Sequence, residues 1–361
     1  MNPAAVITGV GSINAAFSGG AEALGAWLAR PGSAVRRSSR LGVVAAEVDL
    51  ALPGRFVGES EARRLTRICQ LAVAAGRVAL EDAGLGAGAD LSLVLGTEFG
   101  DLHSTMAFAD GYLASGPSGL SALLFPNTVI NAMAAATAIA VTAHGPSLTL
   151  NARTVAGELA VIRAAGMIAG GRVSAVLAGG VDEINPRVSE VLADLGADAE
   201  VRGEGATFVV LESPEAARSR GARVRGEIVG VASRTLPARP HGVGRDGASR
   251  AIPIALAAAG LDARAPGWVY ASLGGDPARD AWQARVLDEA LAPHRPPRAS
   301  LRPWLGEHAG VDVLSVAAAA WTARSGRLPA DDGEPARRVP GGQGLVHGLA
   351  RGGTEVAMVV R

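Results

Sequence analysis

Residues 145–183 read GPSLTLNARTVAGELAVIRAAGMIAGGRVSAVLAGGVDE, and the fold is most readable from this stretch. Residues 147–150 predict a strand, and the apolar spacing over 154–169 predicts a helix that two glycines end. An apolar run, 174–177, leads into another pair of glycines. Alternation of apolar strands and helices is typical of α/β proteins whose largely parallel sheets are covered on both faces.

The same alternation continues on both sides of this stretch. Upstream, residues 4–8 predict a buried strand followed by a turn at 9–11, and residues 61–82 predict an amphipathic helix. Further strands are expected at 91–95, 206–211, 224–229, 269–272 and 356–360, and further helices at 248–259, 280–291 and 311–323. The short helical stretch 216–220 is expected to join two halves of the chain, residues 1–218 and 219–361.

Short motifs lie in an informative order along nearly the whole chain. They are Val6–Gly11, Leu80–Leu85, Phe125–Thr128, Gly145–Ser147, Ala178–Gly180, Gly203–Ala206, Leu211-Glu212 followed by Arg220–Ala222, and Gly352–Thr354. With these motifs the chain resembles the β-ketoacyl synthases, the condensing enzymes of fatty-acid and polyketide synthesis. The resemblance implies a thiolase-like fold, with two similar halves in α-β-α-β-α layers.

The resemblance also marks four positions at which this chain departs from a condensing enzyme. Such an enzyme attacks with a cysteine thiolate, where this chain has Thr154, and a threonine hydroxyl is a much weaker nucleophile without a base. It uses two histidines and a lysine nearby, and the corresponding residues here are Ser272, Glu307 and Arg302. An anionic Glu307 would oppose enolate charge, so we expect that no residue of this chain is catalytic. Arg351 stands where the family usually has a gating aromatic residue.

These replacements imply the inactive partner of a ketosynthase heterodimer, the chain-length factor of type II polyketide synthases. The active ketosynthase subunit would receive the acyl carrier protein and carry out malonyl loading, while this subunit shapes the acyl tunnel. Such factors usually have glutamine at the nucleophile position. Because Thr154 departs from that pattern, we favour a reducing system that makes polyenes over an aromatic pathway.

The resemblance places the tunnel and the dimer axis beside residues 99–112. The candidates for setting tunnel depth are Thr105, Met106, Ala109 and Tyr112, and for each of them plain core packing is the alternative. The strand 147–150 is expected to pair antiparallel with its counterpart in the partner, with the apolar helix 132–143 packed beside it.

Two other functions stay open at this point. In the first, the chain is a free-standing acyltransferase or hydrolase in which Thr154 is the nucleophile and His308 or His144 is its base. In the second, it is a scaffold without any role in a tunnel.

Composition excludes several further classes. The 34 basic and 34 acidic residues balance, which argues against a nucleic-acid partner, and the absence of lysine excludes Schiff-base chemistry. Cys69 is the only cysteine and is interpreted as a small buried residue, so no intrachain disulfide can form. The six histidines lack metal-site spacing, and Asn14 stands at the third glycine position of a possible dinucleotide loop, so no cofactor is expected. Without a basic leader or a long apolar run, we expect a soluble, cytoplasmic protein that does not contact membranes.

Overall fold

The computed structural model describes residues 5–38, 41–49, 56–86, 88, 90–194 and 200–361. Its main sheet has eleven strands among these residues, and ten of them form one continuous path. The path runs β6 (Ser147–Asn151), β5 (Leu91–Thr97), β7 (Ala175–Asp182), β9 (Gly205–Glu212), β1 (Ala5–Asn14), β10 (Gly226–Thr235), β16 (Thr354–Val360), β15 (Gly344–Leu349), β11 (Val269–Ala271) and β12 (Arg298–Ala299), with β2 (Ser18–Gly19) paired to β1. Two small sheets, β3 (Arg36–Arg37) with β4 (Val44–Ala46) and β8 (Arg202–Gly203), and β13 (Arg327–Leu328) with β14 (Arg337–Arg338), lie apart from it.

The sheet consists of two halves with the same strand pattern. From β1 outward the pairings are antiparallel, antiparallel, parallel and parallel, and the same sequence of pairings is found from β10 outward. The halves meet where Ala5 pairs with Ile228. The two similar halves are as predicted, but the sheets are less parallel than expected, because a strand buried on both faces has the same apolar pattern in either direction.

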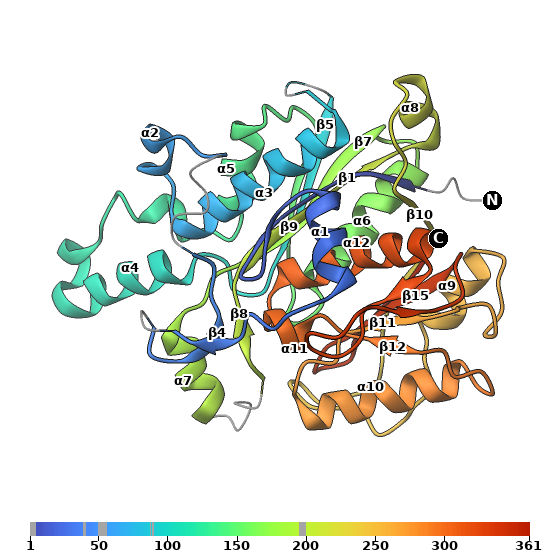
Figure 1. Ribbon diagram of the computed structural model, residues 1–361. Coiled ribbons are helices and arrows are strands. Elements are labelled where there is room, and N and C mark those ends of the chain that lie inside the picture. The colour runs from blue at the N-terminus through green and yellow to red at the C-terminus, as the bar shows by residue number, and fades with distance from the viewer. Residues whose placement is uncertain (1–4, 39–40, 50–55, 87, 89, 195–199) are drawn as a thin grey trace.

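The two halves of the sheet and the helices that cover them form five layers, in the order helix, sheet, helix, sheet, helix (Figure 1). On the outside of the first half lie α3 (Arg67–Ala83) and α5 (Ala132–Ala140), and on the outside of the second lie α9 (Ile252–Ala258) and α10 (Pro277–Ala290). Between the halves, α6 (Ala156–Ala169) packs on α12 (Ala309–Ser325), and both contact strands of each half. This arrangement is the predicted α-β-α-β-α order.

Gly157 allows the two central helices to approach closely. A Cβ atom at Gly157 would lie 2.3 Å from the Ala309 carbonyl oxygen, so any side chain there would force the helices apart. The contact fixes the start of α6 against the start of α12, which is the region that contains the candidate site.

The remaining helices lie around the rim of these layers. They are α1 (Ala21–Ala29), α2 (Glu59–Ala62), α4 (Leu102–Ser115), η2 (Gly116–Gly119), η3 (Phe125–Asn127), α7 (Pro186–Asp194), α8 (Pro214–Ser219) and α11 (Arg302–Leu305). In Figure 1, α4 projects from the body of the molecule. A helix, α8, is found where a join between halves was expected, although the boundary at 218/219 remains a proposal.

Two local predictions are wrong. Residues 9–11 do not turn, because β1 continues through them to Asn14, and both glycines there face α3. A Cβ atom at Gly9 would lie 2.3 Å from the Ala79 carbonyl oxygen, so these glycines allow close helix packing and form no nucleotide loop. The helix expected over 61–82 begins only at Arg67, and its end at left-handed Gly84 is as predicted.

No helix among the described residues is both long enough and apolar enough to span a membrane.

Candidate functional site

Thr154 lies in the sharp turn between β6 and α6, at the centre of the molecule. Its φ angle is 68°, in the left-handed region, and its side chain is buried. A β-branched residue in this conformation is strained by about 1–2 kcal/mol, so the surrounding contacts must hold it. One of them is the Arg302 guanidinium, which donates from Nη2 to the Thr154 carbonyl oxygen at 2.7 Å.

The buried Arg302 side chain connects all four positions that the sequence marked as altered. Arg302 is the first residue of helix α11, and its Nη1 donates to the Ser272 carbonyl oxygen at 2.5 Å. Its Nε lies 3.1 Å from Glu307 Oε2, and its Nη2 lies 2.6 Å from Asp312 Oδ1. Sequence positions far apart are therefore gathered around one guanidinium group.

The Ser272 hydroxyl is fully engaged within the protein. It donates to Gln283 Oε1 at 3.1 Å and accepts from the Leu349 amide at 3.0 Å. The Gln283 amide in turn contacts His347, whose Nε2 lies 3.2 Å from Glu355 Oε1. Ser272 therefore serves as one end of a buried polar chain, with its hydroxyl directed to protein partners.

Glu307 is completely buried between two arginines. In addition to Arg302, Arg279 Nη1 lies 3.5 Å from Glu307 Oε2 and 2.7 Å from Glu200 Oε1. Burial raises the pKa of Glu307, and the charge of Arg302 only partly offsets this. Sequence reasoning missed Arg279 and Glu200. The available signal was an arginine directly before Asp280 in the first turn of α10.

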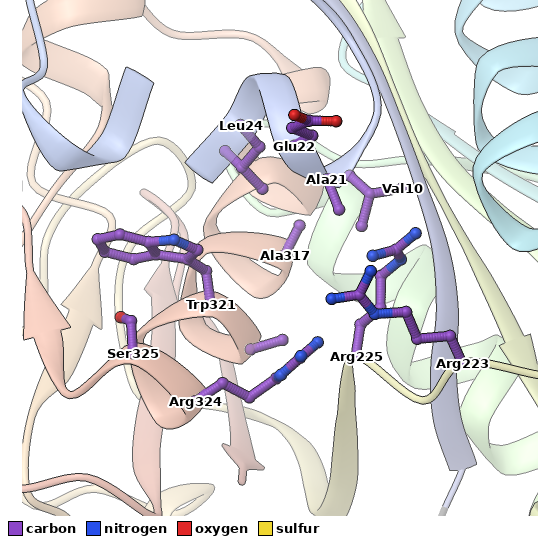
Figure 2. Close-up of a pocket in the computed structure, with 11 residues that line it drawn as sticks. Val10, Ala21, Glu22, Leu24, Arg223, Arg225, Ala317, Trp321, Arg324 and Ser325 are labelled. Atoms are coloured by element: carbon purple, nitrogen blue, oxygen red, sulfur yellow. The ribbon is translucent and has the colours of Figure 1, made fainter. Parts of the chain in front are cut away.

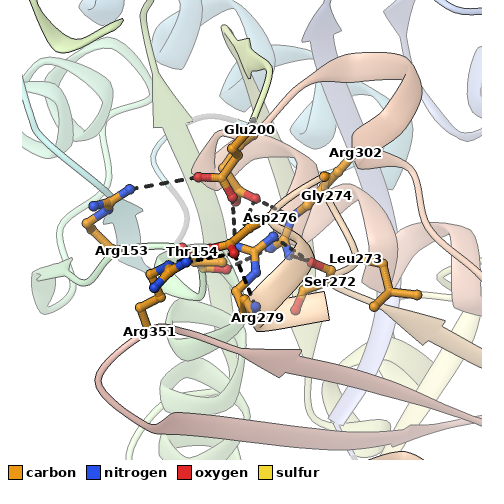
Figure 3. A network of polar contacts seen from close by, with 12 residues as sticks. Arg153, Thr154, Glu200, Ser272, Leu273, Gly274, Asp276, Arg279, Arg302 and Arg351 are labelled. Carbon is orange, nitrogen blue, oxygen red and sulfur yellow. Dashed lines mark hydrogen bonds and ion pairs between the residues drawn. The ribbon is translucent and has the colours of Figure 1, made fainter. Parts of the chain in front are cut away.

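A second ion pair lies at the edge of this cluster. Arg351 Nη2 donates to Asp276 Oδ1 at 2.7 Å, and its Nη1 donates to the His241 carbonyl oxygen at 3.2 Å. Figure 3 shows this pair in the same network of polar contacts as Arg153, which pairs with Glu200 at 3.8 Å. Arg351, which stands where the family usually has a gating aromatic residue, is therefore held in place by its hydrogen bonds to Asp276 and His241.

Neither histidine proposed as a base is joined to Thr154. Within the described residues, no hydrogen bond connects His308 or His144 with Thr154. Burial, together with the charges of Arg202 and Arg302, lowers the pKa of His308 to about 3. An imidazole with this pKa is a poor general base at neutral pH.

Asp182 links the two central strands of the first half to helix α12. It accepts from the Thr97 hydroxyl at 2.7 Å and from the Ala309 amide at 2.8 Å. Burial and the neighbouring Glu98 raise the pKa of Asp182 to about 7. In the part of the chain that the structure describes, no three His, Cys, Asp or Glu side chains gather into a possible metal site.

The four predicted tunnel residues lie on the surface of the single chain. Thr105, Ala109 and Tyr112 are exposed and Met106 is half-buried, while Ser104 is the one buried residue of α4. Exposure of Thr105, Ala109 and Tyr112 does not fit core packing of these three residues within the single chain. Their role in a tunnel shared with a partner stays a prediction.

The family model described as beta-ketoacyl synthase, N-terminal domain, matches residues 28–217. The chain has the thiolase-like ketosynthase fold and belongs to the β-ketoacyl synthase family.

Two curated relatives illustrate the similarity. A 3-oxoacyl-[acyl-carrier-protein] synthase 2 from Synechocystis sp. is 30% identical over 66% of this chain, and the match spans only 64% of that protein. The "Putative polyketide beta-ketoacyl synthase 1" of Streptomyces virginiae is 31% identical over 77% of this chain and 74% of its own length. Among solved structures, the ishigamide ketosynthase/chain length factor superposes with a TM-score of 0.90 at 24% identity, covering 100% of this chain and 99% of that one.

Proposed function

We propose that this chain is a noncatalytic ketosynthase-like subunit, a chain-length factor, that pairs with an active β-ketoacyl synthase and shapes the tunnel for its growing acyl chain. The observation that carries the proposal is the ionic cluster of Arg302, Arg279 and Glu307, which fills the site around Thr154. A family member that keeps its scaffold but fills its own site in this way is suited to a supporting role.

The chemistry of condensation is poorly served by this cluster. Decarboxylation of a malonyl group needs hydrogen-bond donors aimed at a developing oxyanion. Glu307 offers carboxyl oxygens held by arginines, and the Ser272 hydroxyl is already engaged with Gln283. Thr154 lacks the low-pKa sulfur that accepts acyl groups at neutral pH.

The surface of the chain supports pairing with another subunit. Strand β6 ends the sheet, pairing with β5 on one side only among the described strands, so its other edge offers free backbone donors and acceptors. Helix α4, the turn before η3 and helix α5 carry exposed apolar side chains, among them Leu113, Leu123 and Ile139. A large exposed apolar patch is typical of a protein interaction site.

The active subunit would then bind the acyl carrier protein, and this chain would set where the tunnel ends. One solved structure with the same fold is a ketosynthase/chain length factor, which is consistent with this assignment. The polyene product class expected from the sequence stays a prediction.

An acylation assay tests the proposal directly. The purified chain is incubated with malonyl- and acyl-carrier protein, and we expect neither CO₂ release nor an acyl adduct by intact-mass spectrometry. An adduct on Thr154 would contradict the proposal. The matched variant Thr154→Cys is expected to remain inactive in condensation, because the cluster around Arg302 still lacks a histidine pair.

A further inference from the structure

A cavity of about 620 Å³ lies away from the site around Thr154, between α1, the start of β10 and the C-terminal end of α12. Three arginines line it, namely Arg223, Arg225 and Arg324. Figure 2 shows their guanidinium ends directed into the same space from two separate elements. Since the chain as a whole has no net charge, this concentration of positive charge is a local feature.

One of these arginines is held rigidly and the other two are free to bind. Arg225 Nη2 donates to Asp82 Oδ1 at 2.6 Å, and its Nε donates to the Thr8 carbonyl oxygen at 3.3 Å. Arg223 and Arg324 are exposed, and neither has an ion pair or side-chain hydrogen bond among the described residues. Burial, with added repulsion from Arg223 and Arg324, lowers the pKa of Arg225 despite its pairing with Asp82. An anion placed here would relieve that repulsion.

The opposite wall offers an aromatic ring and an acceptor. Trp321 lines the cavity from α12, and its indole packs so close to α1 that a Cβ atom at Gly25 would lie 3.0 Å from its Nε1. The small neighbours Ala317 and Ala320 leave room beside the ring. Glu22 lies across the cavity from the guanidinium groups, where a carboxylate can accept from sugar hydroxyls (Figure 2).

We propose that this cavity binds a phosphorylated ligand with a flat ring, the chemistry of a nucleoside diphosphate. The forked guanidinium donors of Arg223 and Arg324 match phosphate oxygens, and Arg225, already paired with Asp82, lines the cavity beside them. Trp321 provides a stacking surface for the base. The volume lies within the range of small-molecule sites.

Calorimetric titration of the full chain with ADP, pyrophosphate and adenosine tests this assignment. We expect saturable ADP binding that weakens with rising salt, quenches tryptophan fluorescence and is tighter than binding of either fragment. The double variant Arg223→Gln/Arg324→Gln should bind ADP at least about tenfold more weakly than the wild type. Both positions are exposed, so the fold should remain intact. The control Arg264→Gln, an exposed arginine outside the cavity, should bind ADP as the wild type does.

Several outcomes would overturn the proposal. Absence of ADP binding at about 1 mM, or equal binding by the double variant and the wild type, would remove the site. Pyrophosphate binding as tightly as ADP would exclude the ring from recognition, and adenosine binding as tightly would exclude the phosphates.

Discussion

At the scale of single residues, the Arg302 guanidinium lies buried among the carboxyl groups of Glu158, Glu307 and Asp312. Replacing it in Arg302→Met leaves Glu158 and Asp312 without their counter-charge and leaves Glu307 with Arg279 alone. Breaking a buried ion pair from one side typically costs about 3–5 kcal/mol, so the free energy of unfolding should fall by this amount. Urea denaturation at pH 7.5 measures the change.

The matched control for this variant is Arg295→Gln. Arg295 also pairs with a carboxylate, Asp288 at 2.9 Å, but its side chain is 71% exposed. An exposed pair contributes less than about 1 kcal/mol. If both substitutions lowered the free energy of unfolding equally, the buried Arg302 cluster would stabilise the protein no more than an exposed ion pair does.

His308 gives a pH-dependent prediction. Its folded-state pKa of about 3 lies below its value of 6.5 in the unfolded chain, so the unfolded state binds more protons between these values. The contribution of His308 to stability is therefore complete above pH 6.5 and is lost as the pH falls. Between pH 7.5 and 5, His308→Gln should lose about 2 kcal/mol less stability than the wild type. Identical pH profiles would mean that His308 protonates freely in the folded protein.

At the scale of elements, periodicity located the buried helices and strands because their environment is uniform. It failed at β1, where Gly9 resembles a turn residue and instead accommodates the backbone of α3. It also could not place Arg279 in the site, because a contact between α10 and the loop at Glu200 depends on tertiary packing. Thr154, Ser272, Arg302 and Glu307 were found by motif spacing, and the structure gathers them around Arg302.

Strand β6 provides a test of the proposed interface. Pro146 accepts from the Leu93 amide and Ala152 donates to Thr97, so the alternation of a parallel strand directs the Thr149 amide away from β5. Thr149→Pro removes a donor from the open edge and leaves the pairing with β5 in place. We expect loss of copurification with a coexpressed ketosynthase partner, measured by affinity capture, with an unchanged circular dichroism spectrum.

Thr149→Val is the control for this experiment, because it keeps the backbone donor and should retain the partner. If Thr149→Pro captured the ketosynthase partner as well as the wild type does, the edge of β6 would lie outside the interface.

Helix α4 carries the prediction on product length. If its side chains line a tunnel completed by the partner, Thr105→Trp or Ala109→Phe should obstruct the acyl chain by about 1–3 kcal/mol, and each 1.4 kcal/mol shifts the balance of extension and release tenfold. Products should become shorter, while Met106→Ala and Tyr112→Ala should lengthen them. Mass spectrometry of products from the reconstituted pair is the measurement. Normal assembly with wild-type product lengths in all four variants would place the limit of the tunnel elsewhere.

At the scale of the whole molecule, the two halves and their five layers follow from the order of motifs along the chain. The distribution of exposed apolar side chains does not follow from the order of motifs, because exposure depends on which elements the fold leaves at its rim. Eight of the twelve large apolar side chains that are exposed in the described structure fall between Tyr112 and Ile139. One continuous region of the chain therefore holds most of the apolar surface left without a partner.

That concentration predicts an obligate heterodimer. An interface of this type buries more than about 2,000 Å² and is more apolar than a transient one, so the chain expressed alone should aggregate or give a poor yield. Leu123 is 88% exposed, and Leu123→Asp should improve recovery of the single chain while abolishing the heterodimer in size-exclusion chromatography with light scattering. The control Ile254→Asp, on α9, should assemble normally. A stable, monodisperse wild-type monomer would argue strongly against obligate pairing, since nothing would then be needed to cover the apolar region from α4 to α5.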